Sequence, residues 1–464
     1  MTSFKRTRHM LKALRLAAID SDSSFIGEVS SGAHTNNRNV IPKLSKYFEL
    51  VYIPTTRSIA ALGDRGDAER LAGTLEGIPG SFGMEVPHEV IHFVREELPG
   101  MGKCQRIRRY LEVMLAAARG ADMLLDPDYW PHYPSRVDLE ILGCAPPSSL
   151  ARGDVYYLAR ASGRGAVAVI QSLTDVRNRF PGEILLTYLR SVRDLANPAE
   201  AMSLLAAGPA LSLYWRSLSS DVFATAFLIS RGQLENRPPG CARCRLLYPA
   251  QAWDPGLRRY RGLPKGDYVA ATSRLVALKG VLELPRIHRR IMDETGLRLV
   301  VTGRFFDEPT RRAFGRAVER EGLRLGEDVA LAGFLSKEKY YEALAGARAL
   351  VYPSHSDSFS IVMLESLAAG TPVVAYDIPG PRGVYGGLPA VRFVGEFDWK
   401  AMAAEAVGLA EMPEGERRGL VDDGGVASFL EDHSSWDRVA ERVAEGIAGA
   451  VAARGGPRGT RAAP

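Results

Sequence analysis

Short apolar runs alternate with longer charged segments along the whole chain, and this alternation predicts the fold class. In the first half the apolar runs cover residues 14–19, 50–54, 123–125, 166–170, 220–229 and 244–248, and a helix is predicted over 37–48. In the second half they cover residues 268–273, 297–302, 329–334, 350–352, 373–376 and 390–394. Helical patterns from about residue 280, over 309–321 and over 337–345 separate the later runs. Strands that alternate with helices are typical of parallel sheets, so we expect an α/β protein.

The length of the chain and one connector divide this pattern into two halves. At 464 residues the chain is too long for one ordinary core. Residues 253–266 are rich in Pro, Gly and Arg and form the expected hinge. We therefore predict a Rossmann-like domain over residues 1–255 and a second one over 256–433. Residues 454–464 are rich in Gly, Pro and Arg, which predicts a disordered tail.

Residues 350–380 hold the most informative motif. An apolar run ends in a polar loop, Asp357 stands at the start of the following helix, and Glu365 lies eight positions later inside that helix. Ligands of parallel α/β sheets bind at the carboxyl ends of the strands, and a helix N-terminus suits a phosphate. Carboxylates beside a phosphate site fit donors such as sugar hydroxyls. The unit therefore predicts a nucleotide-sugar site.

The same residues resemble the paired-acid motif of the family-4 retaining glycosyltransferases. Members usually carry Glu at both positions, with Gly-Phe-Gly after the first. In this chain Glu365 and the ending at residues 369–374 match, whereas Asp357 and the triplet of Ser358, Phe359 and Ser360 depart from the pattern. The resemblance implies the GT-B architecture, in which two Rossmann-like domains with parallel sheets face each other across a cleft. It also implies that a helix at about 434–450 packs back on the first domain.

Two cations lie just inside the second half. Arg274 follows an apolar run and Lys279 opens the next helix, so together they form a receptor for a diphosphate. Their spacing is similar to the diphosphate-binding pair of the family. Gly303 and the pair Gly333 and Phe334 end two further runs and resemble family loops that approach the nucleotide, Gly333 and Phe334 near the base.

The resemblance also implies a chemistry. Arg274, Lys279 and the helix start near Ser360 would hold the nucleoside diphosphate of a sugar donor. Glu365 would accept from the ribose, and Asp357 from the transferred sugar with help from the backbone of 358–360. Transfer would retain the anomeric configuration, with a donor phosphate oxygen taking the acceptor proton. Neither a metal nor another cofactor is expected, because the two cations occupy the role of a metal.

The first half offers weaker candidates for donor contacts. Family members often carry a His after a first-domain strand, where this chain has Gln171. His132, in a loop among aromatic residues, is the nearest substitute. Gly32 is the candidate for a loop that approaches the donor. A structural loop His and a plain turn are the alternatives for these two residues.

Composition bounds the partners. The net charge of +5 does not argue for nucleic acid, and no apolar run approaches the ~20 residues of a membrane span. The basic arm at residues 1–15 and the basic residues at 103–109 indicate either solvated faces or docking to an anionic membrane surface. A glycan or lipid-linked acceptor and a cytoplasmic, peripheral location follow as expectations. Four cysteines fit a reducing compartment, with Cys241 and Cys244 in a CxxC and the other two isolated.

The same sequence also bears on other classes of protein. Asp126-Pro127-Asp128 and Asp20-Ser21-Asp22 spell the DxD of metal-dependent GT-A enzymes, but nothing else of that fold accompanies them. A nicotinamide dehydrogenase is excluded because no G-x-G-x-x-G follows the first strand. A GT-B sugar-nucleotide epimerase or phosphorylase stays open. So does a nucleotide-sugar-binding protein of weak or no transferase activity.

Overall fold

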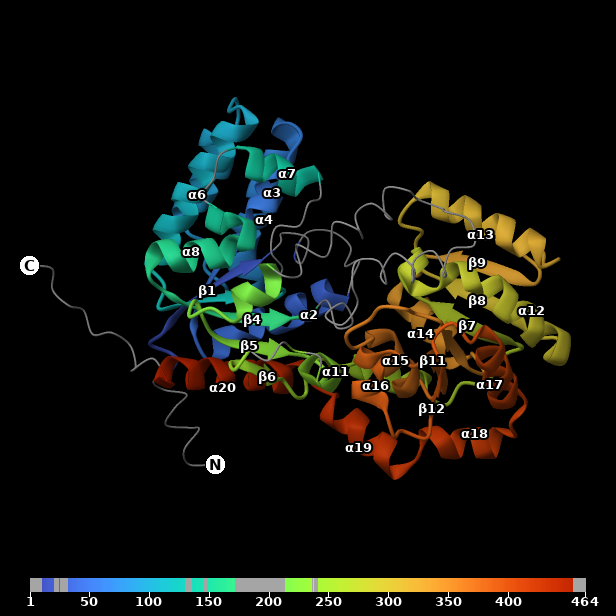
Figure 1. The fold of residues 1–464 in the computed structure, drawn as a ribbon. Coiled ribbons are helices and arrows are strands. Elements are labelled where there is room, and N and C mark those ends of the chain that lie inside the picture. The colour runs from blue at the N-terminus through green and yellow to red at the C-terminus, as the bar shows by residue number, and fades with distance from the viewer. Residues whose placement is uncertain are drawn as a thin grey trace, which may run out of the picture.

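The computed structural model describes residues 11–20, 25, 32–129, 136–144, 148–171, 213–235, 237 and 241–453. Two six-stranded sheets dominate the described chain, each wrapped by helices, and they lie side by side in Figure 1. The first sheet and its helices are called the first lobe, and the second sheet and its helices the second lobe. His132 and residues 454–464 lie outside the described residues.

The first sheet is parallel throughout, in the order β2-β1-β3-β4-β5-β6. Its strands are buried along most of their length, which explains their nearly continuous apolar runs. The strands are β1 (Arg15–Asp20), β2 (Glu49–Pro54), β3 (Met123–Asp126), β4 (Gly165–Ile170), β5 (Phe223–Leu228) and β6 (Cys244–Leu246).

Helices cover the first sheet, including the stretch at 55–100 that the sequence pattern does not assign. They are α2 (Gly32–Val40), η2 (Pro42–Lys46), α3 (Thr56–Ala60), α4 (Arg65–Phe82), α5 (His88–His92), η3 (Phe93–Glu97), α6 (Lys103–Arg119), α7 (Arg136–Gly143), η4 (Ser148–Arg152), α8 (Asp154–Ser162) and α11 (Arg231–Glu235). The prediction of a single helix over 37–48 is wrong. Helix α2 begins and ends earlier, and a separate 3₁₀ turn follows, because Pro42 disfavours continuation of an α-helix through its own position.

The second sheet is also parallel, in the order β12-β11-β10-β7-β8-β9. Its strands are β7 (Tyr268–Thr272), β8 (Arg298–Thr302), β9 (Val329–Gly333), β10 (Leu350–Tyr352), β11 (Val373–Tyr376) and β12 (Val391–Val394). All strands are parallel, but they are added on two sides of β7: β8 and β9 lie on one side, and β10, β11 and β12 lie on the other. The switch point falls between β7 and β10. Ligands of doubly wound sheets bind outside the strands at such a switch point, so the loops after β7 and β10 form the expected site.

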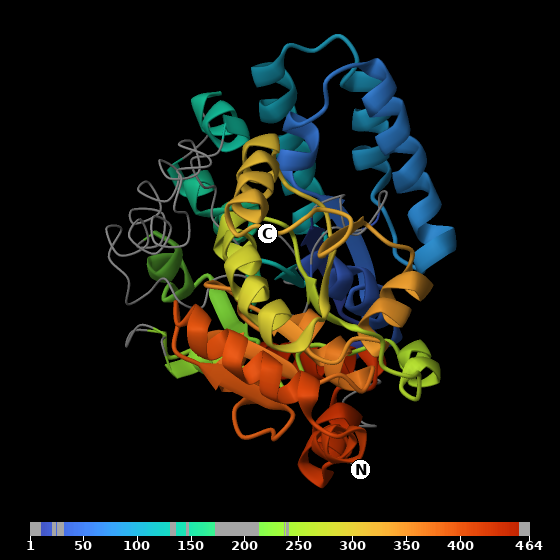
Figure 2. The ribbon, with the colours of Figure 1, turned by 90° about the vertical axis from the view of Figure 1, so that its right-hand side faces the viewer.

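Two layers of helices enclose the second sheet. They comprise η6 (Ala277–Lys279), η7 (Val281–Glu283), α12 (Leu284–Thr295), α13 (Glu308–Arg320), α14 (Lys337–Ala345), α15 (Ile361–Ala368), α16 (Pro379–Tyr385), α17 (Trp399–Glu411) and α18 (Glu414–Val421). The side view in Figure 2 shows α12 and α13, in yellow, on the outer side of this lobe. Helix α12 packs against α17, and their apolar residues form a core separate from that of the first lobe.

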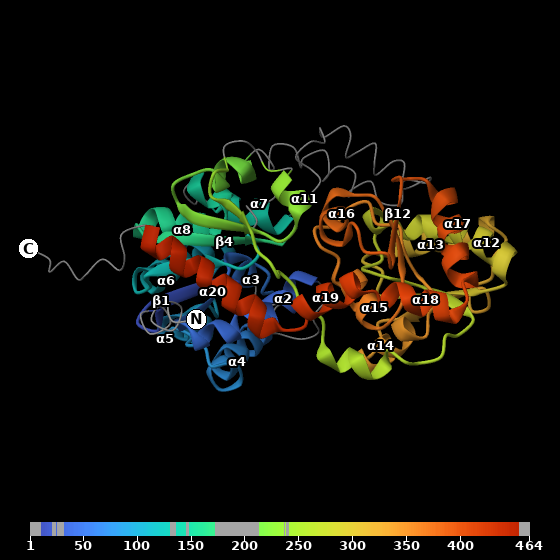
Figure 3. The ribbon, with the colours of Figure 1, turned by 90° about the horizontal axis from the view of Figure 1, so that it is seen from below.

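Two crossings join the lobes at a hinge. The chain leaves β6 through η5 (Pro255–Tyr260), and it returns through α19 (Gly424–Asp432) into α20 (Trp436–Ala453). Figure 3 shows α20 running back along the first lobe, where it contacts α2, η2 and β5. Gly446 of α20 lies so close to Phe227 that an added Cβ would approach the ring to 2.0 Å.

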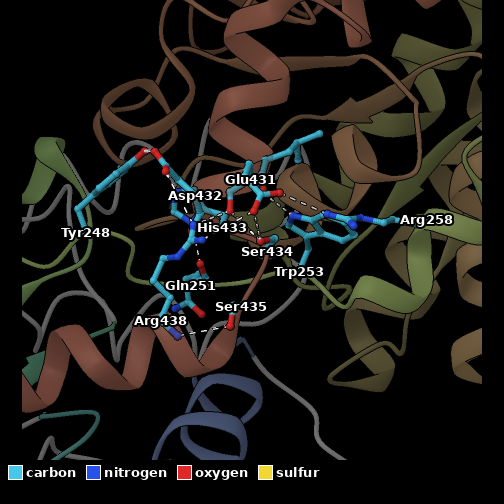
Figure 4. Close-up of polar contacts among 11 residues, drawn as sticks. Tyr248, Gln251, Trp253, Arg258, Glu431, Asp432, His433, Ser434, Ser435 and Arg438 are labelled. Atoms are coloured by element: carbon cyan, nitrogen blue, oxygen red, sulfur yellow. Dashed lines mark hydrogen bonds and ion pairs between the residues drawn. The ribbon is translucent and has the colours of Figure 1, made fainter. Parts of the chain in front are cut away.

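The hinge is held by hydrogen bonds between the two crossings (Figure 4). The backbone N–H of Trp253 donates to the carbonyl of His433 at 3.0 Å, and its indole N–H donates to the carbonyl of Leu430 at 2.8 Å. The His433 ring places Nδ1 2.6 Å from the carbonyl of Gln251. Tyr248 donates to the Asp432 carboxylate at 2.8 Å. The crossings therefore form one unit.

A second contact between the lobes involves glycines. Helix α11 of the first lobe packs against α16 of the second, as Figures 1 and 3 show. A Cβ on Gly232 would lie 2.0 Å from the carbonyl oxygen of Pro379, and one on Gly383 would lie 2.3 Å from the nitrogen of Gly232. The two backbones can approach this closely only because neither residue has a side chain.

The cysteines differ from expectation. Cys104 is bonded to Cys144, although the sequence analysis treats both as isolated, and Cys241 is bonded to Cys244. The first bond joins the start of α6 to the loop after α7, two segments whose proximity depends on tertiary packing. None of the described helices is both long and apolar enough to cross a bilayer. The predicted domain limits stay predictions.

Candidate functional site

The site is centred where the loops after β7 and β10 meet. The loop after β7 carries Arg274 and Lys279, and the loop after β10 carries Asp357 before α15 begins at Ile361. The two loops are docked backbone to backbone. The N–H of His355 donates to the carbonyl of Leu278 at 2.9 Å, and a Cβ on Gly280 would lie 1.9 Å from the carbonyl oxygen of Pro353. This contact fixes the cation and the acid relative to each other.

Lys279 and Asp357 form an ion pair at the centre of the site. Nζ of Lys279 lies 2.9 Å from Oδ2 of Asp357, and these side chains are only 14% and 19% exposed. Nζ also donates to the carbonyl of Ser356 at 2.6 Å, and the hydroxyl of Tyr352 donates to Asp357. Burial alone would raise the pKa of Asp357, but Lys279 and Tyr352 outweigh it and hold this pKa below its usual value. Asp357 is therefore an anion at neutral pH.

Asp357 also organises the start of α15. Its Oδ1 accepts from the backbone N–H of Phe359 at 3.3 Å and of Ser360 at 3.1 Å. Ser360 adopts φ 67°, a left-handed conformation that favours glycine, and its side chain caps the helix by accepting from Met363. Ser358, Phe359 and Ser360 are all buried. The loop is thus a tight turn that wraps the acid.

Glu365 lies on α15, the helix that follows this turn. The Tyr340 hydroxyl donates to its Oε2 at 2.7 Å. Burial raises the pKa of Glu365 to about 7, although the Tyr340 hydrogen bond works in the opposite direction. Burial therefore favours the neutral carboxyl group, and a ligand that donates hydrogen bonds to Glu365 would favour its ionised form.

The other second-lobe candidates surround the same sheet edge. Arg274 is exposed, and its guanidinium has no hydrogen bond or ion pair with any described residue. Gly303 has φ 126°, and a Cβ there would lie 2.0 Å from the carbonyl oxygen of Ser273, so this loop requires glycine. Its N–H donates to the carbonyl of Gly333 at 2.8 Å. Phe334 is 52% exposed, and the Arg304 guanidinium lies 5.6 Å from its ring centre.

The first lobe contributes Gly32 and a network of amides. Gly32 opens α2 and faces α15, with the position of an added Cβ 3.8 Å from Cδ1 of Ile361. Gln171, which follows β4, donates through Nε2 to Oδ1 of Asn37 at 2.6 Å and to the carbonyl of Pro127 at 2.7 Å. Asn37 donates in turn to Asp20 at 2.9 Å. The Gln171 side chain is therefore held inside the first lobe.

Of the two DxD triplets, only Asp126-Pro127-Asp128 lies wholly among the described residues, because Ser21 and Asp22 fall outside them. Asp126 is half-buried beside Asp128, and desolvation together with that neighbour raises the pKa of Asp126 well above its usual value. Within the described parts of the chain, no three His, Cys, Asp or Glu side chains are arranged to hold a metal ion. Sequence reasoning missed Tyr340, Tyr352 and His355. Tyr352 could have been noticed, because it ends a strand five positions before Asp357.

The cations of α6 are occupied inside the first lobe. Lys103 pairs with Glu140, and Arg109 pairs with Glu97 and Glu112. Arg106 donates to the carbonyl of Leu62 at 3.0 Å, and Arg108 donates to the carbonyl of Cys144 at 2.7 Å. These partners give the four cations structural roles, so α6 adds no support for membrane docking.

Comparison with solved structures gives the class of fold. The chain is similar to sucrose-phosphate synthase from Thermosynechococcus elongatus, with a TM-score of 0.62, 15% identity and coverage of 95% of this chain and 100% of the other. It is also similar to Anabaena HepE in complex with UDP, with a TM-score of 0.60, 12% identity and coverage of 94% and 100%. The predicted α/β class and GT-B architecture are confirmed.

Comparison of sequences narrows the class. Residues 258–407 match the family model of the group 1 glycosyl transferases. The chain is 32% identical to the D-inositol 3-phosphate glycosyltransferase of Acidothermus cellulolyticus over 203 residues, which are 40% of this chain and 42% of that protein. The chain is also 36% identical to the D-inositol 3-phosphate glycosyltransferase of Actinosynnema mirum over 100 residues, which are 20% of this chain and 22% of that protein. These matches span less than half of either relative. Residues 258–407 of the second lobe are therefore similar to the group 1 glycosyl transferases, in a chain that has the GT-B fold.

Proposed function

We propose that this protein is a retaining glycosyltransferase of family 4 that uses a nucleoside-diphosphate sugar and no metal ion. The observation that carries the proposal is the meeting of Lys279 and Asp357 at the start of α15, with Glu365 on the same helix. A cation, a helix N-terminus and two carboxylates match the charges of a diphosphate between two hydroxyl-bearing sugars. HepE is solved in complex with UDP, which supports a nucleotide donor.

The proposed reaction assigns each group one task. Lys279 and Arg274 stabilise the leaving nucleoside diphosphate, and Glu365 accepts from the ribose. Asp357 accepts from hydroxyls of the transferred sugar, and Gly32, which opens α2, lets the backbone approach the donor. The bond between the anomeric carbon and the phosphate oxygen breaks. The acceptor oxygen then bonds to that carbon on the same face, and its proton passes to a donor phosphate oxygen.

The acceptor is proposed to be a glycan or a lipid-linked glycan. The names of the two curated relatives indicate a polar, hydroxyl-rich acceptor for those proteins. Peripheral attachment to a membrane would depend on the basic arm at residues 1–15. A vesicle-binding assay with and without that arm, at low and high salt, tests this part by itself.

A ligand screen tests the donor site. The protein is heated with UDP, GDP, ADP and their sugars, and the matching nucleotide should raise the melting temperature by mass action. The matching sugar nucleotide is then incubated with candidate acceptors, with and without EDTA, and the product is analysed by NMR. We expect a retained anomeric configuration and no loss with EDTA. No stabilisation by any nucleotide would overturn the proposal, whereas an inverted product or EDTA sensitivity would overturn the mechanism.

A second candidate is a nucleotide-sugar-binding protein of weak or no transferase activity. The engagement of Asp357 with Lys279 and with two backbone N–H groups favours it, because these contacts occupy the acid that would face the sugar. Nucleotide binding without turnover is its signature. The role of Asp357 has its own test: transfer that survives Asp357→Ala but not Glu365→Ala would refute it. Dependence on added phosphate, or turnover without acceptor, would instead indicate a phosphorylase or an epimerase.

A further inference from the structure

A buried charged cluster lies directly behind the two loops of the site. Its centre is His355, two residues before Asp357, and its side chain has no exposed surface. Glu283 is 2% exposed and ends the short helix that follows Gly280, while Glu396 is 18% exposed and follows β12. These three side chains come from three separate segments of the second lobe, and none is among the site residues that the sequence predicts.

The imidazole lies between the two carboxylates. Its Nδ1 is 3.0 Å from Oε1 of Glu396, and its Nε2 is 3.3 Å from Oε1 of Glu283. The ring stacks on Phe397 at 4.4 Å between centres. Phe397 has φ 70°, a strained conformation for a non-glycine residue, and this stacking contact accompanies it. The position of His355 is thus defined from every side.

The charges around His355 favour the imidazolium form of its ring. The groups that face His355 are Glu283 from η7, Glu396 from the loop after β12, and Tyr376 of β11, which also donates to Glu283. Arg286 of α12 adds one cation, 3.4 Å from Glu283. The imidazole itself lies between the two carboxylates, and this placement favours its protonated form. Burial lowers the pKa of His355, but the hydrogen bonds and charges of Glu283 and Glu396 outweigh burial and raise it.

The cluster is connected to both loops of the site. The backbone N–H of His355 holds the carbonyl of Leu278, the residue before Lys279. Ser356, the residue after His355, accepts from Nζ of Lys279. Glu283 follows Lys279 by four positions and is fixed by the imidazole. A change in the charge of His355 therefore acts on the cation loop and on the acid loop together.

We propose that His355 is a positioning residue which, as a cation clamped by Glu283 and Glu396, holds the Lys279 and Asp357 loops in register for a diphosphate. The inference rests on the proposed function, because it concerns the same diphosphate site. The imidazolium is lost as pH rises through the raised pKa of His355. Above that pH two carboxylates face an uncharged ring, and the register of the loops relaxes. Diphosphate binding should then weaken on the alkaline side.

The test follows the affinity for UDP, the probe, from pH 6 to 10 by titration calorimetry. The wild type should show an alkaline loss of affinity. His355→Gln should bind UDP about tenfold more weakly at pH 7 and lack that loss, since supporting contacts of a site contribute through geometry. Glu396→Gln should move the loss to lower pH, because one carboxylate stabilises the imidazolium less well than two. NMR titration of the His355 ring should follow the same shift.

His288→Gln is the matched control. His288 is another buried histidine of the second lobe, but it contacts the carbonyl of Asp328 at 3.0 Å, away from both loops. Its loss should leave the alkaline loss of affinity in place. UDP binding with no alkaline loss, or a loss that Glu396→Gln does not move, would overturn the inference and leave the proposed function standing. Absence of UDP, GDP and ADP binding at every pH would overturn both.

Discussion

Ser360 combines a helix cap with a backbone conformation that serine rarely adopts. Its φ of 67° and ψ of 83° place it in the left-handed region, and the family pattern has glycine at this position. Ser360→Gly should relieve that strain and lose only a weak cap, since the Met363 N–H lies 3.4 Å from the hydroxyl. We expect the free energy of unfolding to rise by about 0.5–1 kcal/mol in urea titrations.

Ser358→Gly is the control, because Ser358 is buried but is not among the residues with positive φ. That change should lower stability through the extra freedom of the unfolded chain. If both substitutions destabilise the protein equally, the left-handed turn at Ser360 carries no strain, and the glycine of the family pattern would need another reason.

The residues of the site were predictable in kind but not in pairing. A local motif was enough to single out Lys279, Asp357 and Glu365, because charge at a strand end followed by a helix start is visible in sequence. Their partners were not visible. His355 meets Glu396 across 41 residues, and Tyr376 meets Glu283 across 93. Only the completed sheet brings those positions together, and the same is true of the contact between Cys104 and Cys144.

At the scale of elements, strands were easier to predict than helices and their ends. The second lobe follows its sequence pattern closely because β7, β10 and β11 are short buried runs, and the helix predicted over 337–345 is found as α14. The first lobe departs from its pattern at α2. Pro42 is visible in the sequence and disfavours a single helix over 37–48, because the residue before a proline avoids the helical conformation. Long polar helices such as α4 carry weak periodicity and depend on packing.

The hinge contains a histidine that folding keeps neutral. Burial lowers the pKa of His433 from 6.5 to about 4, against the hydrogen bond with Gln251. Between these two pH values the unfolded chain binds a proton that the folded hinge does not, so stability falls as pH decreases from 6.5 toward 4. His433→Gln should remove this contribution and flatten the acid loss by about 1.4 kcal/mol per pH unit at most.

Urea unfolding at several pH values between 4 and 8 measures that slope. Stability of His433→Gln should be lower than wild type at pH 8, where the neutral ring packs against Phe429 and Phe359 with centres 4.6 Å and 5.4 Å away. His88→Gln is the control, since His88 is exposed, and it should keep the wild-type slope. An unchanged slope in His433→Gln would show that the hinge admits water or a proton without opening.

The arrangement of the whole molecule depends on two kinds of contact between the lobes. The hinge crossings supply hydrogen bonds at one end, and the approach of α11 to α16 supplies a contact of bare backbone at the other. The second contact reaches the site, because a Cβ on Gly380 of α16 would lie 2.0 Å from the carbonyl oxygen of Asp357. The contact between the lobes and the position of the Asp357 loop are therefore coupled through α16.

Gly232→Ala tests that coupling directly. The added Cβ would be 2.0 Å from the carbonyl oxygen of Pro379. That oxygen belongs to the backbone and has no other rotamer, so α11 and α16 must separate. We expect a larger radius of gyration by small-angle X-ray scattering, a lower melting temperature and weaker UDP affinity. Gly77→Ala is the control, because nothing lies within 4 Å of its added Cβ on α4. That change should keep the radius and add about 0.5–1 kcal/mol of stability. Equal radii and equal UDP affinities in the two variants would mean that the lobes are held by the hinge alone and that the acid loop keeps its place without α16.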